Sequence, residues 1–163
     1  MTEVARQLPS AGLSAALLSA ALGCAAGGGS AGSLRWDVGD GTGLSVLNVT
    51  RDVLERYQYV IERQSETPFP TMQTHWYERV PFQDEREAGA EQVRTRFVMT
   101  SRERSQRLEG TSMYNVRLVA ENQARMADGS DWQPLEVTPQ FTDYATDIAE
   151  RLRQDLSDGM RVF

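Results

Sequence analysis

Apolar side chains return every three or four positions between residues 49 and 61, with charged side chains mostly opposite them. This spacing predicts an amphipathic helix. We expect it to begin near Asn48 or Thr50, because either side chain can cap a first turn. The residues after Val60 also suit an extended strand, so the end of the helix is left open. Pro68 ends regular structure in this region.

A second helical pattern, over residues 141–156, is the clearest in the chain. Its apolar positions again follow three- and four-residue spacing, while acidic and arginine side chains cover the other side. Thr138 followed by Pro139 predicts its start, and Gly159 predicts its end. The apolar stripe consists of Phe141, Tyr144, Ala145, Ile148, Ala149, Leu152 and Leu156.

Three segments, residues 71–80, 93–102 and 113–125, alternate between apolar and polar side chains instead. Alternation of this kind predicts antiparallel strands with one buried face and one wet face. The large side chains on the buried faces should line either a filled core or a pocket between sheet and helices. These residues are Trp76, Phe97, Met99 and Tyr114.

The segments between these elements are polar or rich in glycine. Residues 81–92 and 103–112 predict long hairpin loops, and the glycine- and aspartate-rich segment 34–44 predicts an irregular lead-in. Two helices with one apolar stripe each can both be buried on the apolar face of one sheet. We therefore predict a single α+β domain over residues 46–163, with a small antiparallel sheet of three to four strands and two amphipathic helices packed on one face.

A short apolar run at residues 11–22 ends beside the only cysteine, Cys24. The run is shorter than the roughly 20 residues of a membrane-spanning helix, and its length is typical of a cleaved export signal. It resembles a bacterial lipoprotein signal peptide over residues 1–23, with Cys24 receiving the lipid. Residues 24–45 would then form a flexible Gly/Ala/Ser-rich tether and the lead-in. The alternative is an alanine-rich helix in a cytosolic protein, with Cys24 buried as a small apolar side chain.

The charge of the chain argues against a nucleic-acid partner. The 163 residues carry a formal net charge of −6, and every basic residue is an arginine. Binding to phosphates needs a concentrated basic surface, which an acidic chain of this kind does not predict.

The sequence offers little for catalysis. His75 is the only histidine, so the common zinc sites and histidine-based nucleophiles are not expected. Residues 37–41 predict a turn, because a calcium loop would need a further acidic ligand. Without a lysine there is no Walker loop. We predict no catalytic residue, no metal, no cofactor and no enzymatic activity.

Charged side chains in the 81–92 loop and on the wet face of the 93–102 strand are candidates for contact with a partner. The arginines of that strand should also pair across strands with Glu78 and Glu121. The candidate contact residues are Asp84, Glu85, Glu87, Arg94 and Arg96.

The order of the elements resembles a known family. It comprises a helix, a strand with Thr74, His75 and Trp76, an acidic loop with Asp84 and Glu85, an arginine-flanked strand at 94–97, a strand at 114–122, and a closing helix with Tyr144. Over residues 46–156 this order resembles the helix-grip domain of the BamC family, lipoproteins of the outer-membrane β-barrel assembly machine. It is also similar to the LptE family, lipoproteins that plug the barrel for lipopolysaccharide insertion.

The BamC resemblance implies a non-enzymatic accessory lipoprotein of outer-membrane biogenesis. Its lipid anchor would hold it on the outer membrane, facing the periplasm, in contact with an envelope protein complex. The LptE resemblance implies a role in lipopolysaccharide transport instead. A third alternative is a periplasmic module that binds a lipid or another apolar ligand between its sheet and helices.

Overall fold

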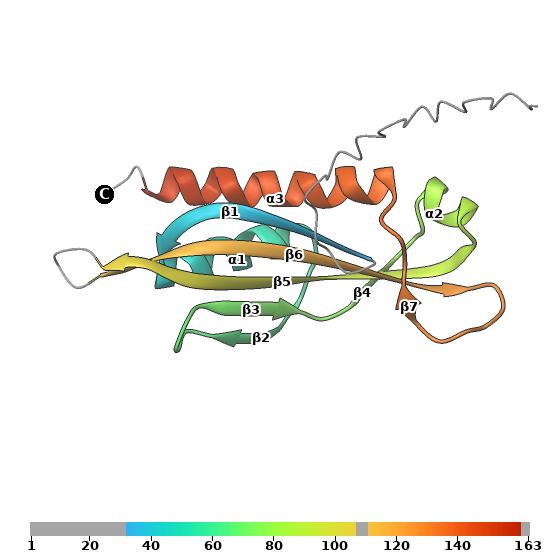
Figure 1. Cartoon of the computed structure of the whole chain (residues 1–163), viewed down its shortest axis with the longest axis horizontal. Helices are drawn as coiled ribbons and strands as arrows, with labels where there is room; N and C mark the ends of the chain where they lie inside the picture. The colour runs from blue at the N-terminus through green and yellow to red at the C-terminus, as the bar shows by residue number, and fades with distance from the viewer. Residues whose placement is uncertain (1–31, 107–110, 161–163) are drawn as a thin grey trace, which may run out of the picture.

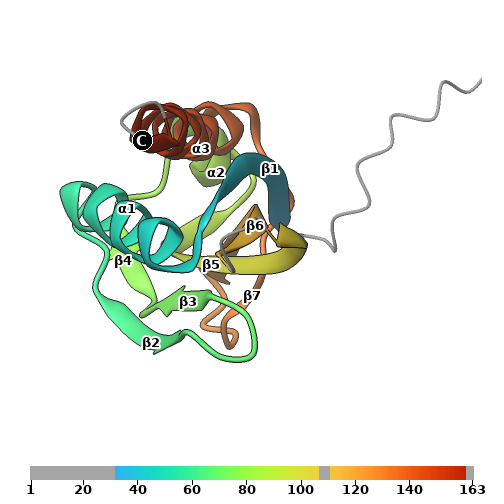
Figure 2. The same cartoon turned by 90° about the vertical axis from the view of Figure 1, so that its left-hand side faces the viewer.

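In the computed structural model, which describes residues 32–106 and 111–160, a seven-stranded antiparallel sheet curls around two long helices (Figures 1 and 2). The predicted α+β class is confirmed, but the sheet is larger than the predicted three to four strands. In chain order the elements are β1 Ser33–Thr42, α1 Gly43–Arg56, β2 Ile61–Ser65, β3 Thr71–Thr74, β4 Tyr77–Arg79, α2 Gln83–Glu87, β5 Ala90–Gln106, β6 Ser112–Met126, β7 Gln133–Pro134 and α3 Pro139–Met160.

The long β5–β6 hairpin is the centre of the sheet, whose strands run in the order β1-β6-β5-β3-β2. The short strands β4 and β7 pair with β5 and β6 respectively. Phe97 lies opposite Ala120, and Met99 lies opposite Leu118. All four side chains are fully buried, so the alternation predicted for the centre of this hairpin is confirmed.

The lead-in predicted to be irregular is strand β1. It pairs with β6 from Ser33 opposite Glu121 to Thr42 opposite Met113. A shift in register between Asp37 and Gly39 absorbs the turn-forming residues as a bulge. Pairing along a long neighbouring strand therefore overrides the weak strand propensity of glycine and aspartate.

Helix α1 starts earlier than predicted, whereas the predicted start of α3 is confirmed. Helix α1 begins directly after β1, at Gly43, and Thr50 is buried within it. Helix α3 begins at Pro139, and Thr138 caps it, because Thr138 Oγ1 accepts a hydrogen bond from the backbone N–H of Phe141 at 3.3 Å. It continues past Gly159, because a glycine inside a helix costs only about 1 kcal/mol.

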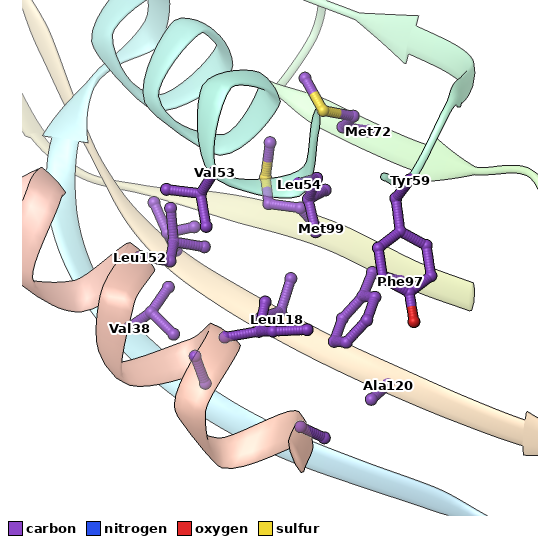
Figure 3. Close-up of a cluster of buried hydrophobic side chains, with 14 of the residues drawn as sticks. Val38, Val53, Leu54, Tyr59, Met72, Phe97, Met99, Leu118, Ala120 and Leu152 are labelled. Carbon is purple, nitrogen blue, oxygen red and sulfur yellow. The ribbon is translucent and has the colours of Figure 1, made fainter. Parts of the chain in front are cut away.

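Helices α1 and α3 pack on the same face of the sheet and fill the space over it (Figure 3). Val53 and Leu54 from α1 meet Leu152 from α3 above Leu118 of β6, and each is at most 1% exposed. The predicted placement of two amphipathic helices on one face is therefore confirmed.

Gly32 provides a test of how β1 and β7 meet. Its φ is +81°, and an added Cβ would lie 2.8 Å from the carbonyl oxygen of Asn122 and 2.9 Å from that of Leu135. We expect Gly32→Ala to lower the free energy of unfolding by about 2–3 kcal/mol, through backbone strain and overpacking. Gly129→Ala is the matched control, because Gly129 has a φ of +76° and open space around it. It should cost only about 1 kcal/mol, and equal losses in urea unfolding would contradict the steric argument.

Candidate functional site

The sheet face turned away from α1 and α3 is rich in arginine, and we call it the open face. On β5, Val93, Thr95 and Phe97 are buried toward the helices, so the residues between them point the other way. The strand register places the matching positions of β1 and β6 on the same side. The arginines of the open face are Arg35, Arg94, Arg96, Arg102, Arg117 and Arg125.

Two tryptophan rings lie between three of these arginines. The Cζ atom of Arg94 is 4.6 Å from the ring centroid of Trp76 and 4.4 Å from that of Trp132. Arg96 lies 4.5 Å from Trp76, and Arg125 lies 5.0 Å from Trp132. The five side chains form one continuous arginine–tryptophan stack, in which each cation–π contact contributes about 0.5–1 kcal/mol.

The two tryptophans reach the stack from opposite sides of the β5–β6 hairpin. Trp132 precedes β7, whereas Trp76 lies in a two-residue break between β3 and β4. Because of this break, Trp76 is on the open face, and Tyr77 and Arg79 turn toward the helices. The prediction of one continuous strand over residues 71–80 with Trp76 in the core is therefore wrong.

Hydrogen bonds fix the stacked guanidinium groups but leave donors unused. Arg94 donates from Nε and Nη2 to Gln123 Oε1, at 3.0 and 2.7 Å. The predicted cross-strand pair between Arg96 and Glu121 is confirmed, with Nε 2.6 Å from Oε2. Arg94 lies opposite Glu78 in register but donates to Gln123 instead. Within the described residues, Nη1 of Arg94 and both Nη atoms of Arg96 make no hydrogen bond.

The setting of Arg94 makes a nearby anion favourable. Its loss of contact with water between the two rings lowers the pKa of Arg94, and the neighbouring charges of Arg125 and Arg96 act in the same direction. Glu78 opposes the shift. The guanidinium group stays charged at neutral pH, so a bound anion would act by offsetting the neighbouring positive charges of Arg96 and Arg125.

A second group of polar side chains lies further along the open face. Arg102, Asn115 and Arg117 line a hollow of about 260 Å³ together with Thr100 and Ser101. Arg117 donates from Nε to Asp37 Oδ1 at 3.2 Å, while the exposed Arg102 has no partner among the described residues. The hollow is therefore a second place where an anionic group could be held.

The acidic segment predicted as a loop contains helix α2, and this changes the role of Glu85. Its carboxylate is fully buried and accepts hydrogen bonds from Arg79 Nη1 and Nη2 at 2.8 and 2.6 Å. The backbone N–H of Phe82 and Nδ2 of Asn122 donate to it as well, both at 2.8 Å. The Arg79 side chain is only 8% exposed. Glu85 is therefore part of an internal ion pair, and its prediction as a partner contact is wrong.

The other two acidic candidates differ from each other. Asp84 Oδ2 accepts a hydrogen bond from the backbone N–H of Gln140 at 2.8 Å, which ties α2 to the first turn of α3. Glu87 is exposed and accepts one from Gln83 at 2.9 Å. Of the three acidic residues, Glu87 is the one left at the surface.

The four residues predicted to line a core or pocket do not come together. Phe97 and Met99 are fully buried in the filled core. The ring of Tyr59 packs edge-on against Phe97 at 4.9 Å, and burial raises the pKa of Tyr59. Tyr114 is half-buried and lines a surface depression near the start of α1, while Trp76 is in the stack.

Other features of the chain bear on function only indirectly. His75 is exposed, and within residues 32–106 and 111–160 no three His, Cys, Asp or Glu side chains gather closely enough to hold a metal ion. None of the helices in this part of the chain is long and apolar enough to cross a membrane. Cys24 and the segment 1–23 lie outside the described residues. No protein-family model matches the chain, and no curated protein matches it in sequence.

Proposed function

We propose that this chain is a non-enzymatic lipoprotein that is anchored through Cys24 and acts by surface contact in outer-membrane biogenesis, as the resemblance to the BamC family implies. One observation carries the contact mode of action. The space between sheet and helices is filled by side chains such as Phe97 and Leu118, whereas hydrogen-bond donors remain unused on the open face. This arrangement favours binding at the surface over binding of an enclosed ligand.

The short length of the proposed tether supports a folded domain that is held close to the membrane. Nine residue steps separate Cys24 from the start of β1 at Ser33. A fully extended chain of this length reaches about 30 Å. Several acyl chains would be needed for stable anchoring, because one chain gives only marginal binding. Anchoring then raises the effective concentration of the domain near membrane partners.

The anchor is tested with Cys24→Ala. We expect the native protein to stay in the membrane fraction after an alkaline wash, and the variant to lose the acylation because it lacks the sulfur atom. Intact-mass spectrometry of the native protein should show a lipid-modified chain that begins at Cys24. An intact Met1 and an unmodified thiol in the soluble cytosolic fraction would contradict the proposed anchor.

The role in outer-membrane biogenesis is tested by capturing crosslinked partners from envelopes. The chain contains no lysine, so a photoreactive residue placed at Glu150 on α3 or at Thr100 on the open face replaces amine-reactive reagents. Recovery of barrel-assembly components supports the proposed function. Recovery of lipopolysaccharide-transport components favours the LptE-like alternative, and recovery of neither set contradicts both roles.

A further inference from the structure

We propose that the open face docks on the anionic phospholipid surface of the membrane that holds the anchor, and so turns α1 and α3 away from that membrane. This inference rests on the proposed lipid anchor. It assigns a membrane surface, rather than a protein, as the occupant of the arginine-rich face.

The first argument is the separation of charge across the domain. The six arginines of the open face are accompanied by acidic side chains from β1, β2, β4 and β6, namely Asp37, Asp40, Glu62, Glu78 and Glu121. The opposite side of the domain carries helix α3, where acidic residues outnumber arginines. Since the whole chain has a net charge of −6, an anionic surface is repelled by the side that carries α3 and interacts more favourably with the arginines of the open face. The charge distribution therefore favours one orientation.

The second argument is the place where the tether joins the sheet. Ser33, the first residue of β1, lies opposite Glu121, and Glu121 is the ion-pair partner of Arg96. The backbone N–H of Asn122 donates to Gly32, and its carbonyl accepts from Leu135 next to β7. Adjacent strands are about 4.8 Å apart, so the backbone of Arg96, one member of the stack, lies about 10 Å from the tether junction. Because the tether can reach no further than about 30 Å, the stack stays near the headgroups.

The third argument is the chemistry of the arginines. Guanidinium groups bind phosphate oxygens through paired N–H donors, and the stack already holds Arg94 and Arg96 in place on the sheet. Little side-chain freedom is therefore lost on binding. Tryptophan is typical of membrane interfaces, and the paired side chains of Val98 and Val119 provide an apolar strip between the stack and the hollow at Arg102.

The proposal is tested by energy transfer from tryptophan to a trace of dansyl-labelled lipid. Trp36→Phe leaves Trp76 and Trp132 as the only tryptophans, and both belong to the stack. The purified lipidated protein is placed in vesicles of phosphatidylcholine, with or without phosphatidylglycerol. We expect greater transfer with phosphatidylglycerol, and the difference should disappear at high salt because salt screens the attraction.

Two matched variants separate docking from overall charge. Arg35→Gln with Arg102→Gln removes two exposed arginines of the open face that lie outside the stack. Each arginine near an anionic surface strengthens binding about fivefold, so the preference for the docked state should fall roughly 25-fold. Arg51→Gln with Arg151→Gln removes the same charge from the helix side and should leave the transfer unchanged. Equal transfer in both vesicle types, or equal loss in both variants, would overturn the proposal.

Two further results distinguish this inference from the proposed function. In the first, the open-face variant keeps the lipid-dependent transfer but loses its crosslinks to protein. In that case the face binds a protein, so the docking proposal is wrong and the proposed contact function is retained.

Mass spectrometry of the same sample shows whether Cys24 carries a lipid. If the sulfur carries no lipid, the anchor is wrong, and docking is then measured by co-sedimentation with the phosphatidylglycerol vesicles. Absence of co-sedimentation would overturn docking as well.

Discussion

Glu85→Gln is expected to lower the free energy of unfolding by about 3–5 kcal/mol, because it leaves the buried guanidinium group of Arg79 without a counter-charge. The aromatic ring of Phe82, 4.1 Å from Arg79 Cζ, cannot replace a carboxylate. Urea unfolding of the purified protein measures the loss. Glu87→Gln makes the same chemical change two residues further along, at an exposed site of the same helix, and should stay within about 0.5 kcal/mol of the native protein.

A double variant identifies the cause of this loss. Replacing both Glu85 and Arg79 with methionine removes the two charges together, and replacing a whole buried ion pair by apolar side chains is often close to neutral. We therefore expect the double variant to be more stable than Glu85→Gln. If Glu85→Gln costs no more than Glu87→Gln, the buried ion pair does not hold α2 against the domain.

Phe97→Ala is expected to cost a similar amount, about 3–5 kcal/mol, through the cavity that it leaves. Phe97 is fully buried, lies opposite the small side chain of Ala120, and is in edge-on contact with Tyr59. A small neighbour cannot fill the space left by the ring. Phe69→Ala is the control, because Phe69 is 43% exposed between β2 and β3. Urea unfolding should show a much smaller loss there, and equal losses would mean that the core relaxes around the cavity.

The regular parts of the fold could be predicted from sequence because burial alone determines their pattern. Along β5 the side chains that face the helices alternate with those that face water, and the amino-acid sequence shows this period of two residues. Helix α3 packs on the sheet along one stripe, so its period is visible as well. Thr138 adds a local start signal that acts through a single hydrogen bond.

The parts that could not be predicted depend on contacts between distant residues. Strand β1 has the composition of a loop and is extended because β6 offers a partner along its length. Helix α2 has only five residues, too few for a periodic signal or for stability without tertiary contacts. The sequence therefore predicts Glu85 as a solvated loop residue, because it does not show that Arg79, six residues earlier, is buried beside it and neutralises it inside the protein.

The stack was missed for a related reason. The sequence predicts Trp76 in the core because the alternation of residues 71–80 indicates one continuous strand. Trp132 lies in a glycine- and aspartate-rich segment that shows no period. The signal that could have found the site was the excess of arginine over acidic residues at the outward positions of β5 and β6, since unpaired arginines on one face favour flat partners such as indole rings.

The two-residue break at His75 and Trp76 makes chain length, rather than residue identity, the critical property of the β3–β4 junction. Deleting or inserting a single residue there would exchange the two sides of β4. Such a change would expose Arg79 to water and leave Glu85 buried without its counter-charge. It would also move the Trp76 indole away from its position between Arg94 and Arg96. A one-residue shift in the register of β4 would thus disrupt both the buried ion pair and the arginine–tryptophan stack. The junction is therefore unsuitable for loop grafting or domain insertion.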